Sequence, residues 1–111
     1  MKVVHCKREP FTKYIGRGSA LGNPFTHLPL HQTKALVQTK SVDESINYCE
    51  RWARGDKSWD GLIPSNSRRR FLAAVKRLSD DDVLGCFCVP QHACHGEVIV
   101  KLHHEMKQML S

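Results

Sequence analysis

The spacing of hydrophobic residues predicts three short strands. The run at residues 2–6, "KVVHC", is short and β-prone, and Pro10 ends any strand close to it. Tyr14 and Ile15 begin a second strand before the chain enters a loop. Residues 83–89, "VLGCFCV", are nearly all apolar, which is typical of a strand buried on both faces.

Helical spacing of apolar residues predicts three helices. Ser41 and Glu44 form a capping box that starts the first helix, and Gly55 ends it. Ser67 is expected to cap the second helix, and the third helix is expected to begin near Cys94.

The order of these elements predicts the fold class. Two strands come first, followed by two helices, a strand and a last helix, which favours helices packed on a sheet. Residues 26–40 show no clear period and are expected to be irregular. A chain of 111 residues is long enough for one domain with its own core, covering residues 1–111. We therefore expect an α/β domain with a small sheet, at least partly parallel, covered by about three helices.

The charge of the chain favours an acidic partner. The net charge is +6, which suits a nucleotide, a nucleic acid or an acidic protein. Arg68, Arg69 and Arg70 stand in the first turn of the second predicted helix, where the helix dipole disfavours cations. That position fits either an anionic partner or a solvated basic face.

The chain contains no stretch that predicts a membrane protein. No segment approaches the ~20 consecutive apolar residues of a membrane span, and the first apolar run is too short for a signal peptide. We therefore expect a cytoplasmic protein with no membrane partner. In a reducing compartment its five cysteines should be thiols, metal ligands or nucleophiles.

Two stretches carry the candidate chemistry, and the first is a glycine-rich loop. Residues 13–25 read "KYIGRGSALGNPF", with glycines at 16, 18 and 22. Glycine lets a backbone adopt positive φ and approach another group closely. The loop is therefore a candidate for contact with a ligand.

The second stretch, "LGCFCVPQHACHGEVI" at residues 84–99, crowds together three cysteines and two histidines. Cys86, Cys88, Cys94 and His95 supply the three thiols and one imidazole of a Cys₃His zinc site. Their spacing differs from that of a common zinc finger. Zinc is therefore one candidate cofactor of this stretch.

The same residues also suit catalysis or packing. Cys94 at a helix N-terminus, beside His95, has surroundings that lower the pKa of a thiol, so the pair could serve phosphoryl or glycosyl transfer. The turn that ends at Gly96 would offer backbone N–H groups to an anion. In the structural alternative, the cysteines are small buried hydrophobes and His95 satisfies backbone groups. The sequence leaves all of these alternatives open.

Five motifs together resemble a known family. They are "YIGR" at residues 14–17, "GNPF" at 22–25, "SVDESINYCERWARGD" at 41–56, "LGCFC" at 84–88 and "CHGEVI" at 94–99. The chain is similar over nearly its whole length to domain-of-unknown-function family 4326 of phages and bacteria. The resemblance implies a compact α/β domain, often phage-encoded and then working in the host cytoplasm, with no activity that can be transferred.

The resemblance also implies which polar residues belong to the motifs. They are Arg17, Asn23, Cys86, Cys88, Cys94 and His95. This chain departs from the family pattern where "QHA" lengthens the link between Pro90 and Cys94. At the level of the fold alone, such a domain is similar to Rossmann-like nucleotide-binding domains.

We expect the glycine loop and the Cys-His turn to meet around one pocket. Tyr14, Arg17, Asn23 and Gly96 would then bind a nucleotide or another phosphate-bearing ligand, and the protein could act on it. Arg17 would bind phosphate as a planar fork, and Asn23 would bond a base or sugar. The oligomeric state stays open.

Two other functions remain open. The first is a zinc-stabilised adaptor for a host protein, in which Trp52, Trp59 and Phe71 would contact the partner. The second is a basic nucleic-acid-binding domain, with the cations Arg68, Arg69, Arg70, Lys76 and Arg77 on the phosphates.

Overall fold

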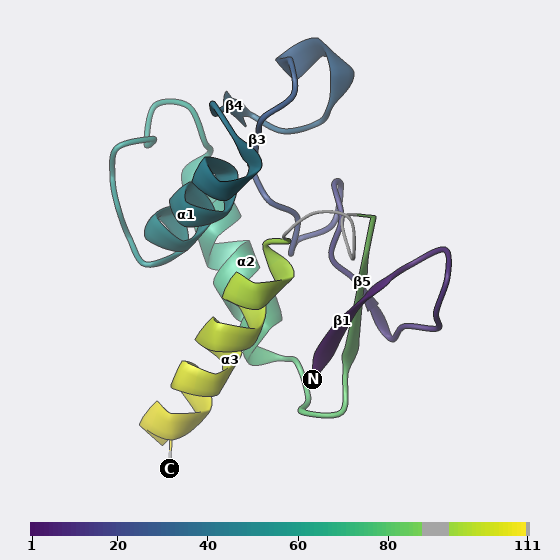
Figure 1. Cartoon of the computed structure of the whole chain (residues 1–111). Coiled ribbons are helices and arrows are strands. Elements are labelled where there is room, and N and C mark those ends of the chain that lie inside the picture. Colours follow the sequence, from purple (N-terminus) through teal and green to yellow (C-terminus); the bar gives the residue numbers. More distant parts are fainter. Residues whose placement is uncertain (88–93, 111) are drawn as a thin grey trace.

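Three parallel strands form the main sheet of the protein. The computed structural model describes residues 1–87 and 94–110. The strands are β1 (Lys2–His5), β2 (Lys13–Tyr14) and β5 (Val83–Cys86), arranged in the order β1-β5-β2. Both neighbours run parallel to β5 (Figure 1). The most apolar strand therefore lies at the centre of the sheet, as a parallel arrangement requires.

Three helices lie to one side of this sheet (Figure 1). They are α1 (Val42–Ala53), α2 (Ser65–Lys76) and α3 (Gly96–Leu110). The predicted α/β class, with a small parallel sheet and three helices, is confirmed. In the described part of the chain, no helix has the length and apolar character needed to cross a membrane.

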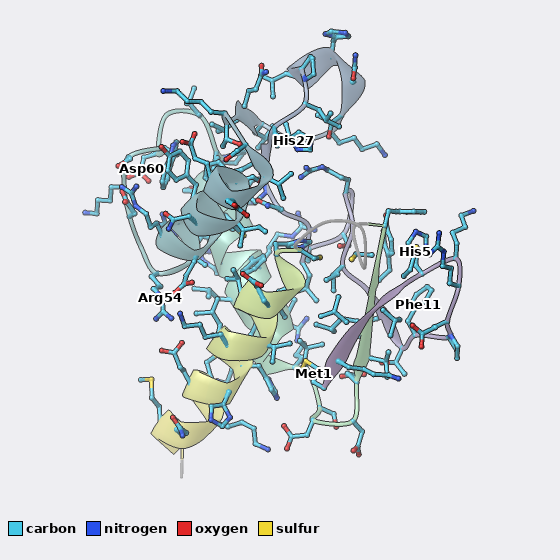
Figure 2. The ribbon with its side chains drawn as sticks, viewed as in Figure 1. Met1, His5, Phe11, His27, Arg54 and Asp60 are labelled. Carbon is cyan, nitrogen blue, oxygen red and sulfur yellow. The ribbon has the colours of Figure 1, made fainter. Side chains whose placement is uncertain are left out.

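The two faces of β5 have different cover. Leu84 and Cys86 face the helices and are buried. On the opposite face, the Phe11 ring packs over Gly85 and Phe87 is exposed. Figure 2 shows Phe11 on the side away from the helices. The expectation of burial on both faces is therefore only partly correct, because side chains rather than a helix cover the second face.

Helix starts follow the predicted chemistry in one case and not in the other. Ser41 Oγ accepts the N–H of Glu44 at 3.1 Å, so the predicted capping box starts α1. The second predicted cap is wrong, because α2 begins at Ser65 and no side chain caps it. Pro64 precedes that helix with a φ of −55°, in keeping with its ring, and the N–H that it lacks is one that a helix start does not use.

A second, smaller sheet occupies the region expected to be irregular. β3 (Phe25–Thr26) pairs in parallel with β4 (Val37–Gln38), and the 3₁₀ turn η1 (Leu30–Gln32) lies between them in the chain. Each strand has two residues, which is too short for any period to show in the sequence. Phe25 nevertheless anchors this sheet, since its ring is fully buried in the core.

The aromatic residues proposed for an adaptor surface belong to the core. Trp52, Trp59 and Phe71 are all buried, and the rings of Trp52 and Phe71 pack edge to face at 5.3 Å between centroids. The adaptor surface predicted from these residues is therefore wrong. Their apolar area stabilises the contact between α1, α2 and the connecting loop instead.

One cation of the arginine run has an internal role. Arg68 Nη2 donates to the carbonyl of Asp56 at 2.8 Å, and its Nε donates to the carbonyl of Trp52. These carbonyls belong to the C-terminal end of α1 and the loop after it, where a cation complements the helix dipole. Arg68 therefore does not join the exposed basic surface of α2, which Arg69 and Arg70 still share.

Candidate functional site

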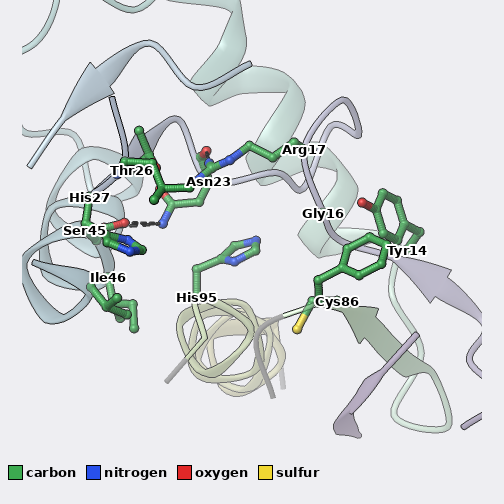
Figure 3. Close-up of a pocket in the computed structure, with 13 residues that line it drawn as sticks. Tyr14, Gly16, Arg17, Asn23, Thr26, His27, Ser45, Ile46, Cys86 and His95 are labelled. Atoms are coloured by element: carbon green, nitrogen blue, oxygen red, sulfur yellow. Dashed lines mark hydrogen bonds between the residues drawn. The ribbon is translucent and has the colours of Figure 1, made fainter. Parts of the chain in front are cut away.

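A cavity of about 240 Å³ lies where the glycine loop, α1, the end of β5 and the start of α3 meet. Arg17 and His95 both line it, although they are 78 positions apart in the sequence. Figure 3 shows the His95 imidazole projecting from the start of α3 toward the loop that carries Gly16 and Arg17. The predicted meeting of the two motifs around one pocket is therefore observed.

The other lining residues come from both sheets, from α1 and from the loops beside them. They are Tyr14, Gly16, Asn23, Thr26, His27, Leu28, Val42, Ser45, Ile46, Cys86 and Phe87. Sequence reasoning missed His27, because it falls in the region without a period. It also missed Ser45 and Ile46, whose helical spacing indicated only core packing.

The glycine at position 16 is explained by the ring of Tyr14. A Cβ atom at Gly16 would lie 2.1 Å from the Tyr14 hydroxyl oxygen and 2.3 Å from Cζ. Only glycine therefore lets the Tyr14 side chain fold over the start of the loop. The "YIG" motif thus shapes one wall of the cavity, and the predicted ligand residue Tyr14 lines it.

Asn23 holds the loop against α1. Its Nδ2 donates to Ser45 Oγ at 3.0 Å (Figure 3). Its Oδ1 accepts the N–H of Phe25 at 2.9 Å. The second bond is an Asx turn, which fixes the local path of the "GNPF" motif. A bond from Asn23 to a ligand's base or sugar would have to compete with these buried contacts.

Arg17 stands at the same wall of the cavity. Its Nη1 donates to the backbone carbonyl of Asn23, which holds the guanidinium against the loop. The side chain is partly buried, so its charge is less screened by water than that of a surface arginine. The predicted ligand-binding Arg17 is therefore both positioned and adjacent to the cavity.

His95 is buried and neutral. Its Nε2 lies 2.8 Å from the carbonyl of Leu21, and because a carbonyl only accepts, Nε2 carries the proton. Burial lowers the pKa of His95 below 6.5, since the charged form loses its hydration. Nδ1 therefore holds a lone pair, and it lies 3.7 Å from Cys94 Sγ. His95 is placed to accept a proton from that thiol.

The two described thiols of the second motif are in contact. Cys86 Sγ and Cys94 Sγ lie 3.0 Å apart, and both residues are buried. Cys86 is among the residues that line the cavity, whereas Cys94 is not. The catalytic pair predicted from the sequence was Cys94 with His95, but the sulfur-bearing residue at the cavity is Cys86. The signal for it was the alternation of β5, which puts Cys86 on the buried face.

The amide groups at the start of α3 are used within the turn. The N–H of Gly96 donates to Cys94 Sγ at 3.3 Å. The N–H groups of Glu97 and Val98 donate to the carbonyls of Cys94 and His95 at 3.2 and 2.9 Å. The prediction that Gly96 offers its amide to a ligand is therefore corrected, because the helix start caps itself with Cys94.

Only some of the predicted zinc ligands lie among the described residues. Cys88 lies outside the described residues, and so does the extra His92. Within residues 1–87 and 94–110, no three side chains of the metal-binding types form a group that could hold an ion. The Cys86, Cys88, Cys94 and His95 site accordingly stays a prediction.

The cavity carries no acidic group among its described lining residues. Its ionisable side chains other than thiol and phenol are Arg17, His27 and His95. Tyr14 and Phe87 flank it with their rings 6.1 Å apart between centroids at an interplanar angle of 80°. A charged ligand in this space would therefore meet cationic, hydrogen-bonding and aromatic groups, a combination that suits an anion with a planar part.

Comparison with known proteins gives one match. A family model described as Domain of unknown function (DUF4326) matches residues 2–105, a span that includes every strand and most of α3. No curated protein and no solved structure matches the chain.

Proposed function

We propose that this chain, which belongs to the DUF4326 family of domains without an assigned activity, binds a phosphate-bearing small molecule of the nucleotide class in the cavity. One observation carries the proposal: Arg17 and His95 line the same hollow, and no carboxylate is among its described lining residues. Because His95 is neutral, Arg17 supplies the positive charge of this pocket, which favours an anion and disfavours a cation.

Arg17 is the group that would bind the phosphate. A guanidinium carries five N–H donors in a rigid fork that matches the oxygens of a phosphate. Its contact with the carbonyl of Asn23 fixes the fork before the ligand arrives, so less side-chain freedom is lost on binding. His27, exposed at the same hollow, adds a second donor.

The aromatic residues at the cavity would receive the planar part of the ligand. The residues Tyr14 and Phe87 are 37% and 53% exposed, so their rings are accessible from outside. Stacking of a base on an aromatic side chain contributes roughly 1–3 kcal/mol. The cavity is smaller than most small-molecule pockets, which measure roughly 300–1,000 Å³, so part of a nucleotide would extend past its rim.

Titration calorimetry with a panel of nucleoside mono-, di- and triphosphates tests the proposal. We expect heat with at least one nucleotide, and weaker binding by about tenfold or more in Arg17→Met, because one charge-assisted bond contributes roughly 1.5–3 kcal/mol. Arg69→Met is the matched control, since it removes the same charge from the exposed face of α2. Thermal unfolding of both variants checks that the Arg17 change leaves the fold intact.

Two results would count against the proposal. The first is an absence of heat with every nucleotide, and the second is equal weakening by the Arg17 and Arg69 substitutions. Chromatography of the same samples detects any conversion of the nucleotide, for which Cys86 and His95 are the candidate nucleophile and base.

The contact between the thiols supports a second candidate, a zinc site that stabilises the fold, without the adaptor surface of Trp52, Trp59 and Phe71, which are buried. Cys94 Sγ lies 3.0 Å from Cys86 Sγ and 3.7 Å from His95 Nδ1. The other ring nitrogen of His95 donates its N–H to a backbone carbonyl, as zinc-bound histidines commonly do. Elemental analysis of protein purified without a metal-affinity tag checks this. One zinc per chain, with unfolding on chelation, supports the zinc site, and metal-free folded protein excludes it.

A further inference from the structure

Two cysteines from separate elements are held with their sulfur atoms facing each other. Cys86 ends β5, and Cys94 precedes the first residue of α3 by two positions. Their Sγ atoms are 3.0 Å apart, whereas a disulfide bond measures 2.03–2.05 Å. An approach of about 1 Å would therefore bring the sulfurs to bonding distance.

The backbone on both sides of this pair is fixed. The carbonyl of Cys86 accepts the N–H of Cys6 at 2.9 Å, which continues the pairing of β5 with β1. On the other side, Gly96 at the start of α3 packs against Val3 and Ile15. The sulfurs are thus held together by the sheet and the helix that flank them, and their proximity follows from tertiary structure.

Two polar groups lie against the sulfur of Cys94. The N–H of Gly96 donates to Cys94 Sγ at 3.3 Å, and His95 Nδ1 lies 3.7 Å from the same sulfur with a lone pair toward it. The His95 lone pair can therefore accept the thiol proton when the sulfur reacts, and the backbone N–H is placed to donate to the sulfur at that moment. The other sulfur belongs to Cys86, a residue that lines the cavity, so a small oxidant has a path toward the pair.

We propose that Cys86 and Cys94 form a redox-active dithiol that a peroxide converts into an intramolecular disulfide. In the first step the Cys86 sulfur attacks one peroxide oxygen, the O–O bond breaks, and the Cys86 thiol proton passes to the leaving oxygen, so that a sulfenic acid and one water form. In the second step the Cys94 sulfur, having given its proton to His95, attacks the Cys86 sulfur and expels hydroxide. That hydroxide takes the proton from His95 and leaves as water.

The overall reaction balances with the peroxide as the oxidant. Two thiols lose two hydrogens and two electrons, the peroxide accepts both, and two molecules of water result when the oxidant is hydrogen peroxide. Because the pair is buried, with Cys86 1% and Cys94 5% exposed, the reaction suits an oxidant close to water in size. A bulky disulfide such as oxidised glutathione should react much more slowly.

The remaining described cysteines lack these surroundings. Cys49 is fully buried, and burial raises the pKa of its thiol to about 12, which keeps it protonated. Cys6 is only partly buried and has no second cysteine in contact among the described residues. Oxidation should therefore be selective for the Cys86–Cys94 pair.

Peptide mapping after hydrogen peroxide treatment tests the inference. Residues 78–101 contain no cleavage site for trypsin before Lys101, so all three cysteines of the motif stay in one tryptic peptide. Chymotrypsin cleaves after Phe87 and separates Cys86 from Cys88 and Cys94. The variants Cys88→Ser and Cys94→Ser then decide which partner Cys86 takes, and dimedone traps any sulfenic acid that is not resolved.

The outcomes separate the possibilities. We expect wild type and Cys88→Ser to lose two hydrogens and to gain the cross-link in most chains, whereas Cys94→Ser gains a dimedone adduct at Cys86 and no cross-link. A cross-link that involves Cys88, or thiols that stay reduced in wild type while a denatured sample oxidises, would overturn the inference. Neither result depends on nucleotide binding, so the two proposals fail separately.

Discussion

Substitution of Gly96 by alanine should destabilise the protein, although alanine is the better helix former. Gly96 is the first residue of α3, and the added Cβ would lie 2.7 Å from Val3 Cγ2, 3.0 Å from Val3 Cγ1 and 3.1 Å from Ile15 Cδ1. Non-bonded carbon atoms prefer separations of roughly 3.5–4.0 Å. The new methyl group therefore requires α3 to move away from the sheet.

The magnitude follows from two opposing effects. Overpacking of this kind costs about 1–3 kcal/mol of the free energy of unfolding. Alanine recovers at most about 1 kcal/mol through its helix propensity, and less at the first position of a helix. We expect a net loss of about 1–2 kcal/mol, which lowers the melting temperature by about 4–10 °C in a domain of this size.

Urea unfolding with two companion variants measures this effect. Gly61→Ala is the control, because no atom lies within 4 Å of the added Cβ and the residue has no positive φ. Val3→Ala removes both methyl groups that the new Cβ would meet, so in that background the Gly96 penalty should shrink. Equal stability of the Gly96 and Gly61 variants, or an unchanged penalty beside Ala at position 3, would refute the packing argument.

Three further predictions concern the caps and the buried histidine. Ser41→Ala should lower the free energy of unfolding by about 1 kcal/mol in a urea titration, because Ser41 caps α1. Arg68→Gln should cost about 1–3 kcal/mol through the lost bonds to the end of α1, whereas Arg69→Gln should stay within about 0.5 kcal/mol; similar losses would contradict the assigned role. Burial lowers the pKa of His95 below 6.5, so on acidification the unfolded chain binds a proton that the folded chain does not. The stability, measured from urea midpoints, should therefore be full above pH 6.5 and should fall below it. The fall should be shallower in His95→Asn.

Local patterns predicted the elements of this fold well where one segment contains the whole signal. Ser41 and Glu44 stand three residues apart: Ser41 Oγ accepts the N–H of Glu44, and the Glu44 carboxylate accepts the N–H of Lys40, so the whole start of the helix lies in one short segment. The apolar run that became β5 was recognisable because a central parallel strand excludes polar residues. The two-residue strands β3 and β4 gave no such signal, because each forms only by pairing with the other and neither is long enough to show a pattern of its own.

The candidate site shows the same division. The sequence indicated that the glycine loop and the Cys-His turn carry unusual residues, and it predicted that they share a pocket. It could not assign Asn23 to a bond with Ser45, or choose Cys86 over Cys94 as the cavity residue. Those assignments depend on side-chain directions after packing, which neither motif contains.

The sequence by itself determined the class of the fold, the start of the first helix, the apolar central strand and the two segments that bear reactive groups. Each of these follows from residues within one turn or one strand of each other, so the chain carries the information locally. Only the tertiary structure decided that Arg68 supports the end of α1 and that the thiols of Cys86 and Cys94 touch. Such contacts join residues distant in the chain, and they form because burial of the shared apolar core brings their elements together.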